Sequence, residues 1–330
     1  MKNINASITA VGSFLPEKIL SNTDLEKIVD TNDEWITSRT GIKERRILDK
    51  GIGTSHMAIQ AANAIIESKK LDPLEIDLVI VATITPDMHA TATAAYVASE
   101  IGASNAFGFD ISAACSGFLY GMSTASAFIE SGRYKKIILI GADKMSSIVD
   151  YSDRNTCIIF GDGAGAVLLE PDYEGYGVQD EYLRSNGSNR NLLRIEAGGS
   201  QTPTTKESVE EKKHFIYQDG KNVFKHAVSN MSDASEQIMN RNNLTPLDVN
   251  YLVAHQANKR IIDATSNRMG IKDKKVLMNI HRYGNTTAAT IPLLLFDFES
   301  KFKKGDNIIF ASFGAGFTWG AMYLKWAYNH

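Results

Sequence analysis

The stretch Ala113-Ala114-Cys115-Ser116-Gly117 joins two segments of different character. An apolar run typical of a β-strand precedes it (106–111), and a run typical of a helix follows it (118–129). Unpaired backbone N–H groups at a helix N-terminus favour a thiolate, and small neighbours let a substrate carbonyl approach the sulfur. We therefore predict that Cys115 is a nucleophile, with an inert buried cysteine as the alternative.

Composition narrows the class of protein. With 330 residues and 43% hydrophobic content, the chain can form two domains or one large domain built from two halves. Its 35 basic and 38 acidic residues are nearly balanced, so the net charge does not favour binding to nucleic acid or to an anionic membrane. Residues 1–6 lack the apolar core of a signal peptide, and no run approaches the roughly 20 apolar residues of a membrane span.

The two cysteines, Cys115 and Cys157, are too few for a disulfide scaffold and fit a reducing compartment. The sequence has no CxxC motif and no pair of histidines at metal-ligand spacing. We therefore expect a cytoplasmic protein without a metal ion, and without nucleic acid or a membrane as partner.

Three sequence patterns occur twice, in the same order. Residues 71–81 resemble 244–254, residues 160–167 resemble 313–318, and the helix-then-strand segment from Cys115 to residue 140 resembles the one from Asn285 to residue 310. The shared order predicts two similar α/β halves, 1–172 and 173–330. The polar, irregular stretch 172–210 is expected to be a connector or a surface excursion.

Related halves would bring three polar side chains together. Cys115 opens a helix in the first half, and Asn285 opens its expected counterpart in the second. His255 ends the apolar strand 252–254. Each residue taken alone has an ordinary structural alternative, namely a core cysteine, a hydrogen-bonded histidine and a turn asparagine. Their positions on a duplicated framework predict that they meet at one site.

The motifs of the chain resemble those of β-ketoacyl-acyl-carrier-protein synthase III, the thiolase-fold enzymes that start fatty acid synthesis. The resemblance covers nearly the whole chain and rests on residues 30–36, 39–42, 110–117, 159–166, 255–258, 284–286 and 313–320. It implies a layered α/β/α/β/α fold made of two duplicated halves.

The resemblance also implies a mechanism. Cys115 would take an acyl group from acyl-CoA, and the backbone N–H groups of Cys115 and Ala315 would form the oxyanion hole. The family usually has glycine where this chain has Ala315. Malonyl-acyl-carrier protein would then lose CO₂, and His255 and Asn285 would donate hydrogen bonds to the resulting enolate. No metal or organic cofactor would be required.

Related enzymes differ at diagnostic positions. Degradative thiolases carry a second catalytic cysteine near the C-terminal glycine-rich loop, whereas residues 310–320 of this chain contain none. Cys157 instead falls in the apolar run 156–160, for which we expect a strand. Elongating synthases have a second histidine where this chain has Asn285. These differences favour a decarboxylating condensation that starts synthesis.

By resemblance, two further surfaces can be assigned. The CoA site would comprise Thr31, Trp35, Arg39, Arg154, Gly220 and Asn258, with Trp35 and Arg154 sandwiching the adenine. An acidic acyl carrier protein would dock on Lys225, Lys259, Arg260, Arg268 and Lys272. An ordinary solvated helix face is the alternative for these basic residues.

The chain departs from the family between residues 87 and 96. The family commonly has a bulky aromatic residue there that caps the acyl pocket of the partner subunit in a homodimer, whereas this chain has Ala90 and Thr91. We therefore expect primers longer or more branched than acetyl, unless Met88 or Tyr96 refills the space. An alternative function is a priming ketosynthase or acyltransferase of a specialised polyketide or aryl-lipid pathway.

Overall fold

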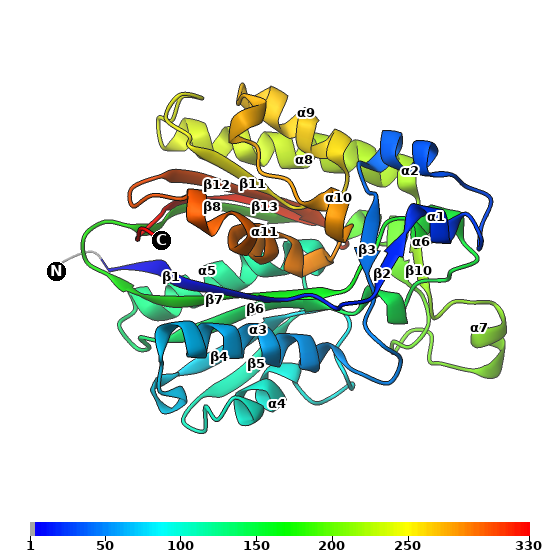
Figure 1. Cartoon of the computed structure of the whole chain (residues 1–330), viewed down its shortest axis with the longest axis horizontal. Coiled ribbons are helices and arrows are strands. Elements are labelled where there is room, and N and C mark those ends of the chain that lie inside the picture. The colour runs from blue at the N-terminus through cyan, green and yellow to red at the C-terminus, as the bar shows by residue number, and fades with distance from the viewer. Residues whose placement is uncertain (1–3) are drawn as a thin grey trace.

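The structure, a computed structural model, describes residues 4–330. Residues 1–3 lie outside the described part. They belong to the N-terminal segment in which we expect no signal peptide. Two large β-sheets and three layers of helices alternate along the molecule (Figure 1). Two further sheets have only two strands each, β9 (Leu193–Ile195) with β10 (Ile216–Gln218) and β2 (Ile19–Ser21) with β3 (Glu44–Arg46). The expected α/β/α/β/α layering is confirmed.

The first sheet has five strands in the order β1-β7-β6-β4-β5. Their bounds are β1 (Asn5–Phe14), β4 (Leu78–Ala82), β5 (Phe107–Ile111), β6 (Ile137–Asp143) and β7 (Gly163–Asp172). β4 is parallel to β5 and β6, whereas β7 is antiparallel to β6 and β1. Helices α3 (Thr54–Lys69) and α4 (Thr93–Glu100) cover its outer face, and α5 (Gly117–Glu130) packs on its inner face.

The second sheet has four strands in the order β11-β12-β13-β8. They are β8 (Gly177–Ser185), β11 (Tyr251–Ala254), β12 (Asn307–Gly314) and β13 (Thr318–Lys325). β11 is parallel to β12, and the other two pairs are antiparallel. Helices α8 (Gly220–Arg241) and α9 (Lys259–Met269) form the outer layer, and α11 (Thr290–Phe298) lies in the layer between the two sheets.

The expectation of an irregular stretch over 172–210 is wrong where strand β8 lies, and further short elements, at 193–195 and 206–210, also fall within it. Strand β8 lies at the edge of the second sheet and is only partly buried along most of its length. An edge strand with one solvated side tolerates polar residues, so it lacks the apolar run that marks a central strand. This is why the sequence pattern hid β8.

The two sheets share one connectivity. Strands β4, β6, β7 and β1 of the first sheet have the same order and directions as β11, β12, β13 and β8 of the second. In both, the outermost of these strands comes earliest in the chain. We propose that this repetition reflects duplicated halves spanning 1–172 and 173–330.

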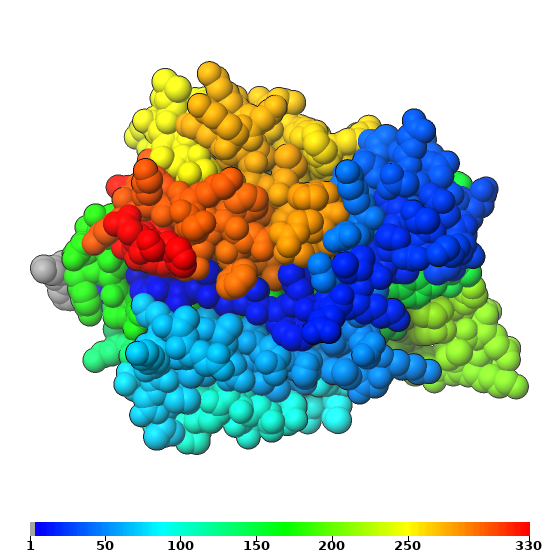
Figure 2. Space-filling view, in the orientation of Figure 1, coloured from blue at the N-terminus to red at the C-terminus, as the bar shows by residue number. Residues whose placement is uncertain are grey.

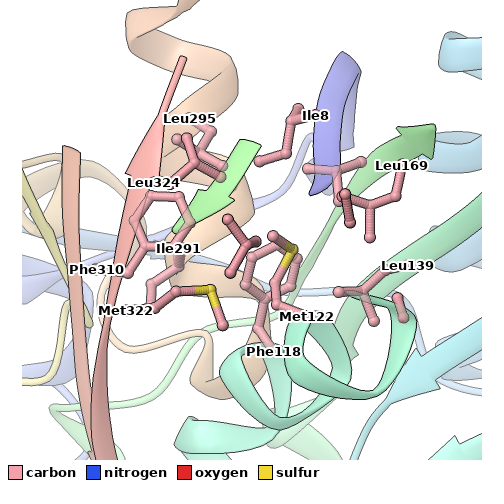
Figure 3. Close-up of a cluster of buried hydrophobic side chains, with 14 of the residues drawn as sticks. Ile8, Phe118, Met122, Leu139, Leu169, Ile291, Leu295, Phe310, Met322 and Leu324 are labelled. Atoms are coloured by element: carbon pink, nitrogen blue, oxygen red, sulfur yellow. The ribbon is translucent and has the colours of Figure 1, made fainter. Parts of the chain in front are cut away.

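Apolar side chains from both sheets and both inner helices form the central core. Figure 3 shows Phe118 and Met122 of α5 packed with Ile291 and Leu295 of α11 and with residues of both sheets. A Cβ atom at Gly141 in β6 would overlap with the carbonyl group of Ala288. Glycine at this position lets the turn before α11 lie directly against the sheet.

The remaining elements gather at one end of the molecule, where α7 projects from the body (Figures 1 and 2). They are β2 (Ile19–Ser21), α1 (Asn22–Leu25), α2 (Asp33–Thr40), β3 (Glu44–Arg46), α6 (Arg154–Cys157), β9 (Leu193–Ile195), α7 (Lys206–Glu210), β10 (Ile216–Gln218) and α10 (Ile280–Tyr283). Among the helices of residues 4–330, none has the length and apolarity needed to cross a bilayer.

The strand expected around Cys157 is wrong, because this residue ends the short helix α6. The Asp153 side chain accepts a hydrogen bond from the backbone N–H of Asn155 at 3.0 Å and caps this helix. The apolar residues that follow are buried in a local cluster rather than in a sheet. A capping aspartate thus overrides the strand-like apolar pattern.

Candidate active site

Cys115 lies where the two halves of the molecule meet. It belongs to the 3₁₀ turn η2 (Ala114–Ser116) between β5 and α5, and its side chain is buried. The Ser312 hydroxyl donates to the Cys115 carbonyl at 2.8 Å, and the Thr318 hydroxyl donates to the Ala113 carbonyl at 2.9 Å. Strands β12 and β13 therefore hold the cysteine turn from the opposite sheet.

A matching turn precedes α11. In η6 (Thr287–Ala289), Thr287 has a φ of 52°, and Ala114 has a φ of 47° at the equivalent first position of η2. The structural counterpart of Cys115 is thus Ala288. Equating Cys115 with Asn285 from the sequence was wrong by three positions, because the short turn before each inner helix has no apolar periodicity that would align it.

The structure nevertheless brings the three expected catalytic side chains together. Cys115, His255 and Asn285 line one cavity of about 220 Å³, along with Gly314 and Ala315. His255 follows the end of β11, and its backbone N–H donates to Ala311 at 2.8 Å. Three loops that are far apart in the sequence therefore supply one site.

Hydrogen bonds orient Asn285. Its side-chain oxygen accepts the backbone N–H of Thr287 at 2.8 Å, which leaves the amide N–H groups to face a substrate oxygen. Sequence reasoning missed the role of Thr287. A threonine with a positive φ gives no local sequence signal, because only the packed turn imposes that backbone conformation.

Sequence reasoning also missed Asp143, a fully buried carboxylate at the end of β6. It accepts hydrogen bonds from Thr83, Ile84 and Thr85 after β4 and from the Thr287 hydroxyl. Asp143 thus ties the turn that orients Asn285 to the first sheet. An acidic residue at the end of a long apolar, buried strand is the signal that could have identified it.

Burial controls the protonation of both reactive groups. It raises the pKa of the Cys115 thiol to about 12, with a smaller contribution from Asp143. The expectation that the helix start favours a thiolate at rest is therefore wrong, since loss of solvation outweighs the backbone hydrogen bond that lowers this pKa. Burial also lowers the pKa of His255 to about 3, so its imidazole is neutral at physiological pH. Nucleophilic attack consequently requires removal of the thiol proton.

Sequence comparisons identify the family. The family described as 3-oxoacyl-[acyl-carrier-protein (ACP)] synthase III matches residues 109–187, and its C-terminal domain matches residues 239–326. Beta-ketoacyl-[acyl-carrier-protein] synthase III 2 of Bacteroides thetaiotaomicron is 55% identical over 100% of this chain and 98% of its own length. The chain belongs to the β-ketoacyl-acyl-carrier-protein synthase III family.

Other relatives support the same family assignment. Beta-ketoacyl-[acyl-carrier-protein] synthase III of Chlorobaculum tepidum is 56% identical over 98% of this chain and 100% of its own. The crystal structure of 3-oxoacyl-[acyl-carrier-protein] synthase III from Aquifex aeolicus has a TM-score of 0.90 and 40% identity, covering 97% of this chain and 100% of that one. The expected family and thiolase-like fold are confirmed. Membership of the family also confirms the expected activity, that of an acyltransferase that starts fatty acid synthesis.

Within this family fold, three of the six residues expected to bind CoA line the catalytic cavity, namely Trp35, Gly220 and Asn258. Trp35 lies near the start of α2, where the Asn32 side chain accepts its backbone N–H at 2.8 Å. Asn258 caps α9, because its side-chain oxygen accepts the Arg260 N–H at 2.9 Å. Its amide nitrogen is the group left to bind a ligand.

The other three expected CoA residues do not line the cavity. The guanidinium carbons of Arg39 and Arg154 lie 4.7 Å and 4.9 Å from the Trp35 ring centre. Both guanidinium groups thus already contact the ring that was expected to stack on adenine. The hydroxyl of Thr31 is buried without a hydrogen-bond partner among residues 4–330.

The residues expected to dock the carrier protein lie on or next to α8 and α9. Ion pairs engage two of them, since Lys259 lies 2.7 Å from Asp263 and Arg268 lies 2.7 Å from Glu236. Arg260 stacks on Phe224, which lines the catalytic cavity, with its guanidinium carbon 4.9 Å from the ring centre. Lys225 and Lys272 are exposed.

The residues expected to cap the acyl pocket, Ala90 and Thr91, are exposed and do not line the catalytic cavity. Thr91, Met88 and Tyr96 line a separate surface hollow. Met88 is 70% exposed and Tyr96 52% exposed, so neither refills the cavity of its own chain. Within residues 4–330, no group of three or more His, Cys, Asp or Glu side chains is arranged to hold a metal ion.

Proposed function

We propose that the protein condenses an acyl-CoA primer with malonyl-acyl-carrier protein, with loss of CO₂, and so starts fatty acid synthesis. The observation that carries this proposal is the convergence of Cys115, His255 and Asn285 on one cavity that Trp35 also lines. A thiol nucleophile, an imidazole and a carboxamide supply the groups that the two half-reactions require.

In the first half-reaction, the sulfur of Cys115 attacks the acyl-CoA thioester, and CoA leaves as a thiolate. The backbone N–H groups of Cys115 and Ala315 stabilise the tetrahedral oxyanion, a contribution of about 3 kcal/mol for each donor. Ala315 does not have a positive φ, so its methyl group causes no backbone strain.

In the second half-reaction, malonyl-acyl-carrier protein loses CO₂ and forms an enolate. The Asn285 amide and the protonated Nε2 of His255 donate hydrogen bonds to the enolate oxygen. The enolate carbon then attacks the acyl group on Cys115, which releases the β-ketoacyl product and the free thiol. The thioester supplies the driving force, so these residues need no metal ion or organic cofactor.

Intact-mass spectrometry tests this function directly. The protein is incubated with a panel of acyl-CoA thioesters, with Cys115→Ala as the control. We expect a mass increase equal to one acyl group in the wild type and none in the variant. Release of the acyl group as a β-ketoacyl product on addition of malonyl-acyl-carrier protein completes the test. A wild type that acquires no acyl group from any thioester contradicts the proposal.

We also propose a homodimer in which Ala90 and Thr91 of one subunit cap the acyl pocket of the other. The exposure of these residues, away from the cavity of their own chain, supports a role toward a second copy. A small cap leaves room for several methylene groups, each worth about 0.8 kcal/mol when buried. Ala90→Phe should then shift the preferred primer toward acetyl-CoA, whereas an unchanged chain-length preference would contradict the small-cap proposal.

A specialised pathway is the second candidate. The priming β-ketosynthase of the R1128 polyketide biosynthetic pathway has a TM-score of 0.90 and 31% identity, covering 98% of this chain and 96% of that one. The small residue at Ala90 favours this candidate, because a roomier acyl pocket would accept a primer longer or more branched than acetyl. Condensation with the carrier protein of fatty acid synthesis, compared with that of a polyketide pathway, distinguishes the two.

A further inference from the structure

The Thr290 hydroxyl group contacts two partners at the start of α11. Its Oγ1 atom lies 2.7 Å from Nδ1 of His255 and 3.0 Å from the backbone carbonyl oxygen of Thr287. A hydroxyl group has one hydrogen to donate, while its oxygen can also accept. The carbonyl can only accept, whereas Nδ1 can donate or accept according to the tautomer of the ring.

We propose that Thr290 is a positioning residue that holds the proton of neutral His255 on Nδ1. In this arrangement Oγ1 accepts the Nδ1–H and donates its own hydrogen to the Thr287 carbonyl, so both contacts are hydrogen bonds. With the opposite tautomer, Thr290 would donate to Nδ1, and its contact with the carbonyl would bring together two acceptors. The arrangement that satisfies both contacts therefore places the lone pair on Nε2.

The other side of the imidazole ring agrees with this assignment. Nε2 is buried and has no hydrogen-bond partner among residues 4–330, and the ring lines the same cavity as Cys115. No protein group among residues 4–330 therefore fixes the proton on Nε2 from this side, and the Thr290 contacts alone decide the tautomer. A lone pair on Nε2 is instead the acceptor that a neutral thiol with a strongly raised pKa requires.

A consistent proton balance follows, and it rests on the proposed role of Cys115 as nucleophile. Nε2 takes the thiol proton as the sulfur attacks the acyl-CoA carbonyl. The C–S bond to CoA then breaks, and the CoA thiolate takes a proton from solvent. The imidazolium uses its Nε2–H as the donor to the enolate, and returns this proton to the sulfur when the condensed product leaves. Nδ1–H stays bonded to Thr290 throughout.

The first test compares three variants. Thr290→Val removes the hydroxyl group and preserves the shape, whereas Thr290→Ser keeps the hydroxyl group. Thr286→Val is the matched control, because the buried Thr286 hydroxyl lies on the same turn and has no hydrogen-bond partner within residues 4–330. Two rates are measured separately, acylation of Cys115 by acyl-CoA and CO₂ release from malonyl-acyl-carrier protein without acyl-CoA.

We expect Thr290→Val to slow acylation about 100-fold, the lower end of what a positioned base contributes. CO₂ release without acyl-CoA should be unchanged or faster, because loss of the Thr290 hydroxyl group frees the tautomer that carries an Nε2–H. Thr290→Ser should restore acylation to within about threefold of the wild type, and Thr286→Val should match it. An acylation rate unchanged in Thr290→Val, or equal losses in both half-reactions, overturns the inference.

The second test needs no substitution at Thr290. In protein labelled with ¹⁵N-histidine, the ring nitrogen shifts distinguish a protonated from an unprotonated nitrogen, and His255→Ala identifies the signals. We expect a protonated Nδ1 and an unprotonated Nε2 near neutral pH, and the reverse assignment overturns the inference. If wild-type Cys115 is never acylated, the proposed function fails, and the tautomer assignment is still decided by the spectrum.

Discussion

Asp143→Asn probes the link between the first sheet and the catalytic turn. One carboxylate oxygen accepts the Thr83 hydroxyl, the Ile84 N–H and both groups of Thr85 at 2.8–3.1 Å. The other accepts the Thr287 hydroxyl and, at 3.4 Å, the Ala288 N–H. Asparagine preserves the first oxygen and replaces the second by an NH₂ group, which cannot accept these donors.

The cost follows from these contacts. Two hydrogen bonds are lost, one of them long, and leaving a buried donor without a partner costs about 1–3 kcal/mol. We therefore expect the free energy of unfolding to fall by about 2–4 kcal/mol in a urea titration. The turn that orients Asn285 should also loosen. Losing half of a donor contribution of about 3 kcal/mol slows condensation about tenfold.

Asp162→Asn is the matched control. Asp162 is also fully buried and accepts the N–H groups of Leu48 and Ser146 and the Ser146 hydroxyl at 2.6–2.8 Å. We expect a similar loss of stability, with condensation less affected than in Asp143→Asn. Equal condensation rates in the two variants, at a temperature where both are folded, would refute the positioning role of Asp143.

Three further predictions concern the thiol and the two surfaces. Because burial raises the pKa of Cys115 to about 12, its alkylation by iodoacetamide should accelerate about tenfold for each pH unit between 7 and 10, and a plateau in that range would contradict the raised pKa. Arg154→Ala should raise the KM for acyl-CoA by about 5- to 30-fold with little change in kcat, because a stacking contact of about 1–2 kcal/mol is lost. Arg184→Ala is the control, since it removes a comparable contact with Tyr182 and should leave this KM unchanged. Lys225→Glu should raise the KM for the carrier protein more than Arg268→Glu, because Glu236 already neutralises Arg268. The difference between the two variants should shrink as the salt concentration rises. A larger effect at Arg268 would exclude this docking surface.

The triad could be predicted because each member lies at an element boundary that the sequence marks clearly. Cys115 follows an apolar run and precedes a helical one, and His255 directly follows a buried strand. Boundaries of this kind depend on local periodicity, which survives in a single sequence. The expected duplication then suggested that Asn285 lies opposite Cys115. The structural counterpart of Cys115 is in fact three residues further on.

The groups that support the triad could not be predicted in the same way. Asp143, Thr287 and Thr290 act through contacts with residues far away in the sequence or through a backbone conformation imposed by packing. Strand β8 escaped notice for a related reason, since an edge position tolerates polar residues. Apart from the buried apolar run that leads into Asp143, nothing in the local composition marks these residues.

Local sequence pattern was enough to indicate layered α/β halves, a thiol nucleophile and two polar partners, because strand and helix periodicity and motif spacing are local properties of the chain. The protonation states of Cys115 and His255 were decided only by tertiary structure. The helix start beside Cys115 suggested a thiolate, yet burial leaves the thiol protonated and the imidazole neutral. Solvation depends on every atom packed around a group, so the pKa of a buried group is a property of the whole fold.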